Sequence, residues 1–118
     1  MSAAADGGRI TIDDFFKVDI RVGTVVAADH LRGARKPSIA LEIDFGPAYG
    51  VKKSAAQITT HYAPADLIGR QVAAVVNLPP RRIAAFASEV LTLGFPDAEG
   101  HVVLIGPSRV VPNGARLF

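Results

Sequence analysis

The sequence of 118 residues contains no cysteine and no tryptophan, and aromatic residues supply only 7% of it. Without cysteine, disulfide bonds and thiolate metal sites are excluded, which fits the reducing cytoplasm that we expect as the localisation. No apolar run reaches the about 18 residues of a membrane-spanning helix, so no membrane span is expected. Neither sign of charge predominates, because 13 basic and 11 acidic residues give a formal net charge of only +2. An argument for binding nucleic acid must therefore rest on where the charges lie.

Apolar residues make up 49% of the chain, which is enough for one packed core. The length fits a single domain. Residues 1–8 are small and polar and lack the apolar stretch of a signal peptide. We expect residues 1–10 to form a disordered tail and residues 11–118 to form one domain, with no repeat or linker.

The first half of the chain predicts a short helix followed by two strands. Thr11 suits a helix N-cap, and Ile12, Phe15 and Phe16 at spacing i, i+3 and i+4 form one helical face. One face of the first strand should carry Ile20, Val22, Thr24, Val26 and Ala28. The second strand should point inward with Ile39, Leu41, Ile43 and Phe45, and outward with Ser38, Ala40, Glu42 and Asp44. Gly23 within the first strand predicts a bulge or a sharp bend.

Three further strands are expected at residues 51–58, 72–78 and 89–95, the middle one apolar throughout and so buried on both faces. Pro64 suits the first position of a short helix, and Gly69 suits its C′ position. This order predicts an all-β, five-stranded Greek-key barrel of the OB-fold type. It has one short helix between strands three and four, and short N- and C-terminal extensions.

The basic residues are expected on the surface with which OB-folds bind oligonucleotides. That surface comprises strands two and three and the loops joining strands one to two and four to five. Seven of the 13 basic residues fall in these segments, namely Arg32, Arg35, Lys36, Lys52, Lys53, Arg81 and Arg82. We expect them to contact RNA phosphates. Glu42 and Asp44 on strand two count against this prediction, and the alternative is that the basic residues are solvated loop charges.

Other chemistry has little support in the sequence. Tyr49, Tyr62 and Phe86 are candidates for stacking on bases, although Tyr62 could equally belong to the core and Phe86 could pack under its loop. The three histidines lack metal-ligand spacing, and there is no phosphate-binding glycine loop or nucleophile elbow. We therefore expect no enzymatic activity, no cofactor and no metal.

The segment from Tyr62 to Glu89 resembles the tRNA-binding domain family. The matching pattern is Tyr62-x-Pro64-x-x-Leu67-x-Gly69-x-x-Val72-x-x-Val75-x-Asn77-Leu78-x-Pro80, closing with Ser88-Glu89. The run Asp19-Ile20-Arg21-Val22-Gly23 matches the first strand of that family. The resemblance implies an OB-fold that binds tRNA or another structured RNA. It also implies that Asn77 and Ser88 are polar contacts to that RNA.

Four segments resemble the stand-alone, CsaA-like members of this family. They are Asp13-Asp14-Phe15-x-Lys17-x-Asp19-Ile20-Arg21, Ser54-Ala55-Ala56-Gln57-Ile58-Thr59, Asn77-x-Pro79-Pro80-Arg81-Arg82-Ile83-Ala84 and Val111-Pro112-Asn113-Gly114. CsaA-like proteins are homodimers described as chaperones in protein export. The resemblance therefore implies unfolded or pre-export polypeptides as partners, besides RNA.

The loop after Arg82 departs from the family pattern. Ala84, Ala85 and Ala87 stand where the family often has a basic residue, a glycine and a lysine. The loop is thus less basic and leaves room for an apolar ligand, with Ile83 and Phe86 as candidate peptide-binding residues. Ala85 also weakens the case for a positive φ at that position.

Apolar residues outside the expected barrel suggest an interface. Candidates for the interface of a homodimer are Phe15, Phe16, Val103, Ile105 and Val111. The alternative is that they cap the ends of the barrel. Two functions remain open: an RNA-binding protein with a chaperone role in export, or a polypeptide-binding export chaperone in which RNA binding is vestigial.

Overall fold

The computed structural model describes residues 7–118, so most of the expected tail at 1–10 lies outside the described residues. The elements are α1 (Ile12–Phe15), β1 (Ile20–His30), β2 (Ile39–Asp44), β3 (Val51–Ala56), α2 (Pro64–Leu67), β4 (Gln71–Val75), β5 (Arg81–Ile83), β6 (Phe86–Ser88), β7 (Leu91–Thr92), β8 (Gly94–Pro96) and β9 (Val102–Leu104). None of the helices in this described part is long and apolar enough to cross a membrane.

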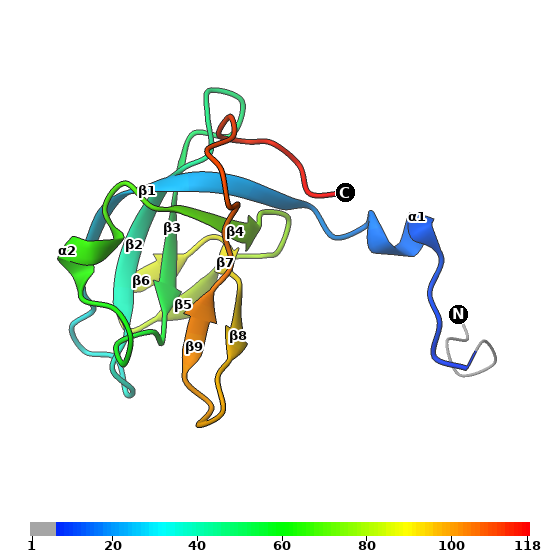
Figure 1. Cartoon of the computed structure of the whole chain (residues 1–118). Coiled ribbons are helices and arrows are strands. Elements are labelled where there is room, and N and C mark those ends of the chain that lie inside the picture. Colours follow the sequence, from blue (N-terminus) through cyan, green and yellow to red (C-terminus); the bar gives the residue numbers. More distant parts are fainter. Residues whose placement is uncertain (1–6) are drawn as a thin grey trace.

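Five antiparallel strands in the order β3-β2-β1-β4-β7 form the main sheet (Figure 1). The sheet curls until β3 meets the chain just before β7, where the backbone N–H groups of Glu89 and Val90 donate to the carbonyl of Lys53 at 2.8 and 3.3 Å. With β4 beside β1, this is a nearly closed Greek-key barrel. The helix α2 lies between β3 and β4 in sequence. The predicted all-β OB-fold is thereby confirmed.

The second strand follows its predicted alternation. Ile39, Leu41, Ile43 and Phe45 are completely buried and form the centre of the core. The prediction that Ser38 points outward is wrong, because Ser38 is buried and its hydroxyl donates to the carbonyl of Lys36 at 3.0 Å.

The predicted face of the first strand is correct at Val22 but wrong farther along. Val25 is buried, whereas Val26, which was expected to share the face of Val22, is 47% exposed. The cause is a shift of register between Val25 and Ala27 in the pairing with β2, which is a β-bulge. The bulge is therefore not at Gly23. A Cβ atom at Gly23 would lie 2.6 Å from Cγ2 of Ile43, so glycine permits close packing there.

Two other predicted strands differ in extent. The strand expected at 72–78 ends at Val75, and the one expected at 89–95 is divided between β7 and β8 at Leu93. The helix α2 ends as predicted, with Gly69 just beyond it at a φ of +87°.

The C-terminal segment pairs with the first half of β1, which β2 does not cover. The N–H of Gly114 donates to the carbonyl of Val22 at 2.8 Å, and the N–H of Leu117 donates to that of Ile20 at 2.8 Å. The short helix α1 instead lies beyond the start of β1, away from the barrel (Figure 1). It has a capping box between Thr11 and Asp14 but no buried residue.

Candidate nucleic-acid interface

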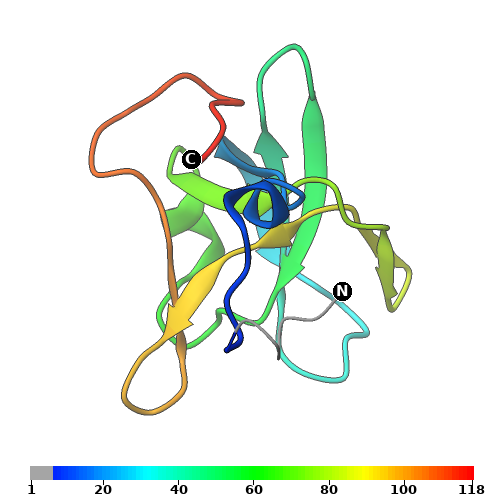
Figure 2. The ribbon, with the colours of Figure 1, turned by 90° about the vertical axis from the view of Figure 1, so that its right-hand side faces the viewer.

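Three segments that are distant in sequence meet around one groove. They are the β1–β2 loop, the end of β3 and the β5–β6 hairpin. In Figure 2 the hairpin, in olive, and the loop, in cyan, lie on the same side of the barrel. They approach closely, since a Cβ atom at Gly33 would lie 3.4 Å from Cβ of Ala84. The resulting basic groove has a volume of about 1110 Å³ and is lined by Gly33–Lys36, Ser38, Ala55–Ile58, Arg81–Ala84, Leu91, Thr92 and Val102.

Four of the seven predicted basic residues line this groove. Arg35 and Lys36 come from the β1–β2 loop, and Arg81 and Arg82 come from β5. All four side chains are exposed. Within residues 7–118 none of them forms an ion pair, so their charge is available to an external anion.

The other three predicted basic residues do not line the groove. Arg32 is exposed beside it in the same loop. Lys52 and Lys53 are paired along β2, where Lys53 faces Glu42, and the ammonium of Lys53 lies 5.9 Å from the ring centre of Phe86. Lys52 and Lys53 lie near the start of β3, whereas the groove is lined by the end of β3 and the residues that follow it, Ala55–Ile58.

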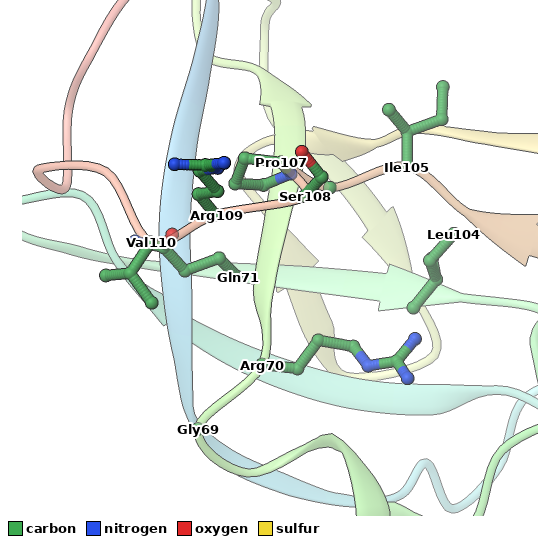
Figure 3. Close-up of a pocket in the computed structure, with 10 residues that line it drawn as sticks. Gly69, Arg70, Gln71, Leu104, Ile105, Pro107, Ser108, Arg109 and Val110 are labelled. Atoms are coloured by element: carbon green, nitrogen blue, oxygen red, sulfur yellow. The ribbon is translucent and has the colours of Figure 1, made fainter.

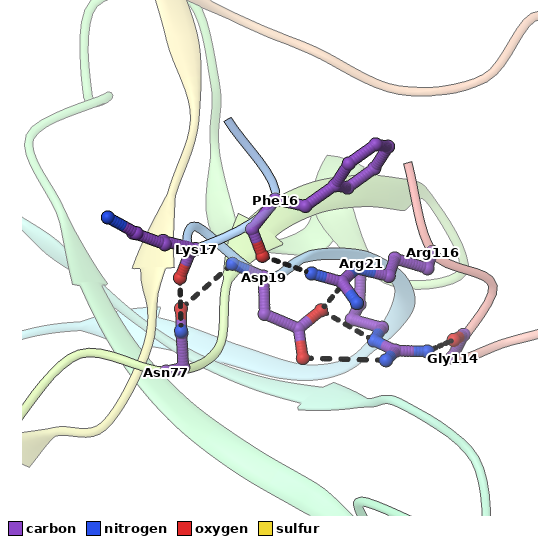
Figure 4. A network of polar contacts seen from close by, with 7 residues as sticks. All are labelled: Phe16, Lys17, Asp19, Arg21, Asn77, Gly114 and Arg116. Carbon is purple, nitrogen blue, oxygen red and sulfur yellow. Dashed lines mark hydrogen bonds and ion pairs between the residues drawn. The ribbon is translucent and has the colours of Figure 1, made fainter. Parts of the chain in front are cut away.

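Asn77 and Ser88, which the family resemblance implied as RNA contacts, are engaged within the protein. The amide of Asn77 accepts from the N–H of Asp19 at 2.9 Å and donates to the carbonyl of Lys17 at 2.8 Å (Figure 4). Ser88 is buried, and its hydroxyl accepts from the N–H of Ala55 at 3.0 Å. Both side chains therefore hold segments of the chain together.

Figure 4 shows that Asp19 also gathers two arginines. Nε of Arg21 donates to its carboxylate at 2.7 Å, and Nε of Arg116 lies 3.4 Å from the same oxygen. Arg21 donates further to the carbonyl of Gly114 at 3.0 Å and stacks over the ring of Tyr49 at 4.7 Å. We call Asp19, Arg21 and Arg116 the paired-arginine network. The sequence pattern Asp19-Ile20-Arg21 therefore fixes the C-terminal segment against β1.

The floor of the basic groove is aliphatic, with Ala55, Ala56, Ile58, Ile83 and Val102. No aromatic side chain lines it among the described residues. The three stacking candidates lie elsewhere: Tyr62 packs on the core and accepts from the N–H of Leu104 at 2.9 Å, Tyr49 lies under Arg21, and Phe86 lies beside Lys53. Of the two candidate peptide-binding residues, Ile83 lines the groove and Phe86 does not.

The tip of the β5–β6 hairpin contains a positive φ of +55°, at Ala84. From the sequence, a positive φ was considered at Ala85 and was expected to be disfavoured there. An alanine with a positive φ carries a steric cost that glycine does not have. The hairpin therefore holds Arg81 and Arg82 in place with a small strain at its tip.

The structure contains two further hollows that the sequence did not predict. A small apolar hollow of about 260 Å³ adjoins the basic groove and shares Ala55, Arg81 and Leu91 with it. Its remaining lining is Leu78, Pro79, Pro80, Ser88, Glu89 and Val90. A hollow of about 400 Å³ lies between residues 69–71 and residues 104–110, and Figure 3 shows Arg70 and Arg109 on different sides of it. Neither has a signal in the sequence, because each forms between segments far apart in the chain.

Two carboxylates outside the groove have lowered pKa values. A hydrogen bond from His61, at 2.7 Å, and one from the backbone N–H of His101 lower the pKa of Asp97 to about 2. The ammonium of Lys17 and the N–H of Thr11 lower the pKa of Asp14. Each carboxylate stabilises a local turn.

Comparisons with known proteins agree with this geometry. Residues 20–116 match the family model of the tRNA binding domain, tRNA_bind. The chain is 38% identical over 115 residues to a methionine–tRNA ligase of Porphyromonas gingivalis, covering 98% of this chain but only 16% of the ligase. The chain thus matches a small part of that much longer protein.

Two solved structures match nearly from end to end. The chaperone CsaA from Bacillus anthracis str. Ames has a TM-score of 0.87 and 50% identity, covering 93% of this chain and 99% of that one. The CsaA chaperone protein from Picrophilus torridus has a TM-score of 0.86 and 44% identity, covering 93% and 100%. The chain therefore belongs to the tRNA binding domain family, as a CsaA-like member.

Proposed function

We propose that the protein binds structured RNA, tRNA included, through the basic groove and without catalysis. The observation that carries the proposal is the convergence of Arg35 and Lys36 with Arg81 and Arg82 on one exposed groove. Guanidinium and ammonium groups without internal partners contact phosphates and release counterions on binding. Membership of the tRNA binding domain family supports RNA as the anion. A cytoplasmic location follows from the proposal, because tRNA is found there.

The proposal predicts a defined dependence on salt. If each of the four basic groups neutralises one phosphate, log affinity should fall with log salt at a slope of about −3. Titration of the protein with bulk tRNA at several salt concentrations measures this slope. Arg81→Ala with Arg82→Ala should make it shallower by about 1.4 and weaken binding to all RNA sequences alike.

A matched control separates the groove from general charge. Arg70→Ala with Arg109→Ala removes the same charge from the hollow between residues 69–71 and 104–110. We expect this control to leave the slope close to that of the wild type. Equal slopes for the two double variants would contradict the groove as the binding site, and undetectable tRNA binding at low salt would contradict RNA binding itself.

A second candidate function has an observation of its own. The groove floor is aliphatic and adjoins the apolar hollow around Leu78 and Leu91. We propose that this combination also accepts unfolded or pre-export polypeptide, as a chaperone in protein export would. Binding of an unfolded polypeptide should then be nearly insensitive to salt and to the loss of Arg81 and Arg82, but should weaken with Ile83→Ser. Dependence on salt equal to that of tRNA would contradict this function.

We propose further that the protein assembles as a symmetric homodimer. Val103 is 44% exposed, and Ile105 and Val111 are half-buried. Phe15, the last residue of the outlying α1, and Phe16 just after it are also only half-buried. A twofold interface would remove this apolar surface from water. Sedimentation at micromolar concentration should give twice the mass of the chain, and a monomer there would contradict the proposal.

A further inference from the structure

Another hollow, distinct from the two described above, continues the basic groove beyond Lys36. This polar hollow has a volume of about 380 Å³ and is lined by Lys36–Pro37, Gln57–Thr60 and Gly100–Val102. It shares Lys36, Gln57, Ile58 and Val102 with the basic groove. A ligand chain that occupies the groove and passes Lys36 therefore enters the polar hollow next.

The polar hollow differs from the groove in its chemistry. Lys36 is the only lysine or arginine among its lining residues, and no carboxylate is present. Its other polar side chains are the amide of Gln57, the hydroxyls of Thr59 and Thr60 and the imidazole of His101. Gln57 is exposed, and neither its amide nor the hydroxyl of Thr59 has a side-chain hydrogen-bond partner among the described residues.

The far wall of the polar hollow is held in position by Asp97. The N–H of His101 donates to Oδ1 of Asp97 at 2.9 Å, which fixes the turn between β8 and β9. The hydroxyl of Thr60 lies 3.2 Å from Nδ1 of His101. The ring nitrogen Nε2 of His101 has no partner within residues 7–118, so the wall offers one more hydrogen-bonding atom.

We propose that the polar hollow binds ribose through its 2′-hydroxyl and so makes the protein prefer RNA over DNA. This inference rests on the proposed RNA binding. Phosphate contacts in the basic groove are the same for both nucleic acids and carry no such discrimination. The 2′-hydroxyl is both a donor and an acceptor, and it is the group that distinguishes RNA from DNA. The amide of Gln57 offers both complementary functions, and the hydroxyl of Thr59 offers them again.

The position of Lys36 supports this division of labour. Its charge borders both spaces, and a phosphate and its neighbouring ribose belong to one nucleotide. A phosphate held at Lys36 therefore brings a ribose to the boundary with the neutral groups. The neutral groups would add little for a free phosphate, which favours the charged rim of Arg81 and Arg82.

The test compares three hairpins of one sequence: RNA, RNA with 2′-fluoro substitution, and DNA. The 2′-fluoro form keeps the A-form backbone but lacks the hydroxyl donor. Fluorescence anisotropy at one salt concentration should show the wild type binding RNA about fivefold more tightly than the 2′-fluoro form for each hydrogen bond lost. The DNA hairpin should bind no more tightly than the 2′-fluoro form.

Two variants locate the preference. Gln57→Ala with Thr59→Val should bind RNA and the 2′-fluoro form with equal affinity, because it removes the proposed partners of the 2′-hydroxyl without changing the charge of the basic groove. Arg81→Ala with Arg82→Ala should weaken binding to all three hairpins and preserve their ratio.

Failure of this inference is distinct from failure of the proposed function. Equal affinity of the wild type for RNA and its 2′-fluoro form would overturn the ribose site, as would a preference that survives Gln57→Ala with Thr59→Val. In either case, weaker binding of the arginine variant would still support the basic groove. If the wild type binds none of the hairpins, RNA binding and the ribose site are both overturned.

Discussion

The arginines of the basic groove and those of the paired-arginine network meet opposite surroundings. Arg21 and Arg116 share the carboxylate of Asp19 and donate to backbone carbonyls at 3.0 and 2.7 Å. Arg81 and Arg82 are exposed on a short hairpin and have no ion pair among the described residues. Arginine side chains therefore have ion-pair partners in the paired-arginine network and, within residues 7–118, none in the basic groove.

This contrast shows how to separate structural from functional basic residues. A guanidinium whose donors are used internally has little left to offer a ligand, and its removal takes hydrogen bonds and part of the counter-charge away from its half-buried partner. A guanidinium with free donors contributes little to stability, but it can bind a phosphate. Substitutions in the paired-arginine network should therefore lower the free energy of unfolding, and substitutions in the basic groove should lower the affinity for RNA.

The largest expected effect is on the paired-arginine network. Arg21→Ala should lower the free energy of unfolding by about 2–3 kcal/mol, because it removes charge-assisted hydrogen bonds around a half-buried Asp19. Urea denaturation measures this loss. The exposed Arg70 is the control, and Arg70→Ala should cost less than about 1 kcal/mol.

RNA affinity completes this test. Arg21 lies outside the basic groove, so the folded fraction of the Arg21→Ala variant should bind tRNA with the wild-type salt slope. If stability is unchanged and RNA binding weakens instead, the division between the two regions is wrong.

The sequence predicted the buried residues best in a regular strand, where alternating apolar residues have a single explanation. Ile39, Leu41 and Ile43 alternate with outward residues on a regular strand, and the core was predicted correctly there. The prediction failed at Val26 because a bulge shifts the register by one residue. An extra unpaired residue leaves the apolar pattern of Val25 and Val26 unchanged, so the sequence could not show it.

The candidate site was predictable only as far as the fold placed it. Once an OB-fold was recognised, Arg35 and Arg81 were expected near each other, and the structure brings them to one groove. Asn77 was expected as an RNA contact, and its hydrogen bonds to Lys17 and Asp19, which lie about 60 residues away in sequence, were not expected. Hydrogen bonds over such separations depend on the folded geometry and leave no local signal.

The second prediction concerns the opposite wall of the basic groove. Arg35→Ala with Lys36→Ala should reduce tRNA affinity by about tenfold at moderate salt and lower the salt slope by about 1.4. The free energy of unfolding should change by less than about 0.5 kcal/mol, since both side chains are exposed and unpaired. Salt-dependent titration and urea denaturation of the same sample check both numbers. A loss of stability without a loss of affinity would place Arg35 and Lys36 with the paired arginines.

The third prediction concerns the exposed hydrogen bond between His61 and Asp97. The folded pKa of Asp97 is about 2, below its ordinary value of 3.8. A lowered folded pKa means that the bond from His61 stabilises the protein above about pH 4, and that this contribution is lost as the pH falls toward 2. Asp97→Asn should therefore lower stability at pH 6, and its difference from the wild type should shrink between pH 4 and pH 2. Urea midpoints across this range measure it, and a constant difference would contradict the ionised partner.

The smallest expected effect is at the tip of the hairpin that carries Arg81 and Arg82. Ala84 has a φ of +55°, which costs an alanine about 1–2 kcal/mol and costs glycine almost nothing. Glycine offsets most of this gain through its greater freedom in the unfolded chain, about 0.5–1 kcal/mol. Ala84→Gly should thus raise the free energy of unfolding by about 0.5 kcal/mol, measurable by urea denaturation against Ala85→Gly as the control. A loss of stability at Ala84 as large as that at Ala85 would mean that the strain is absent in solution.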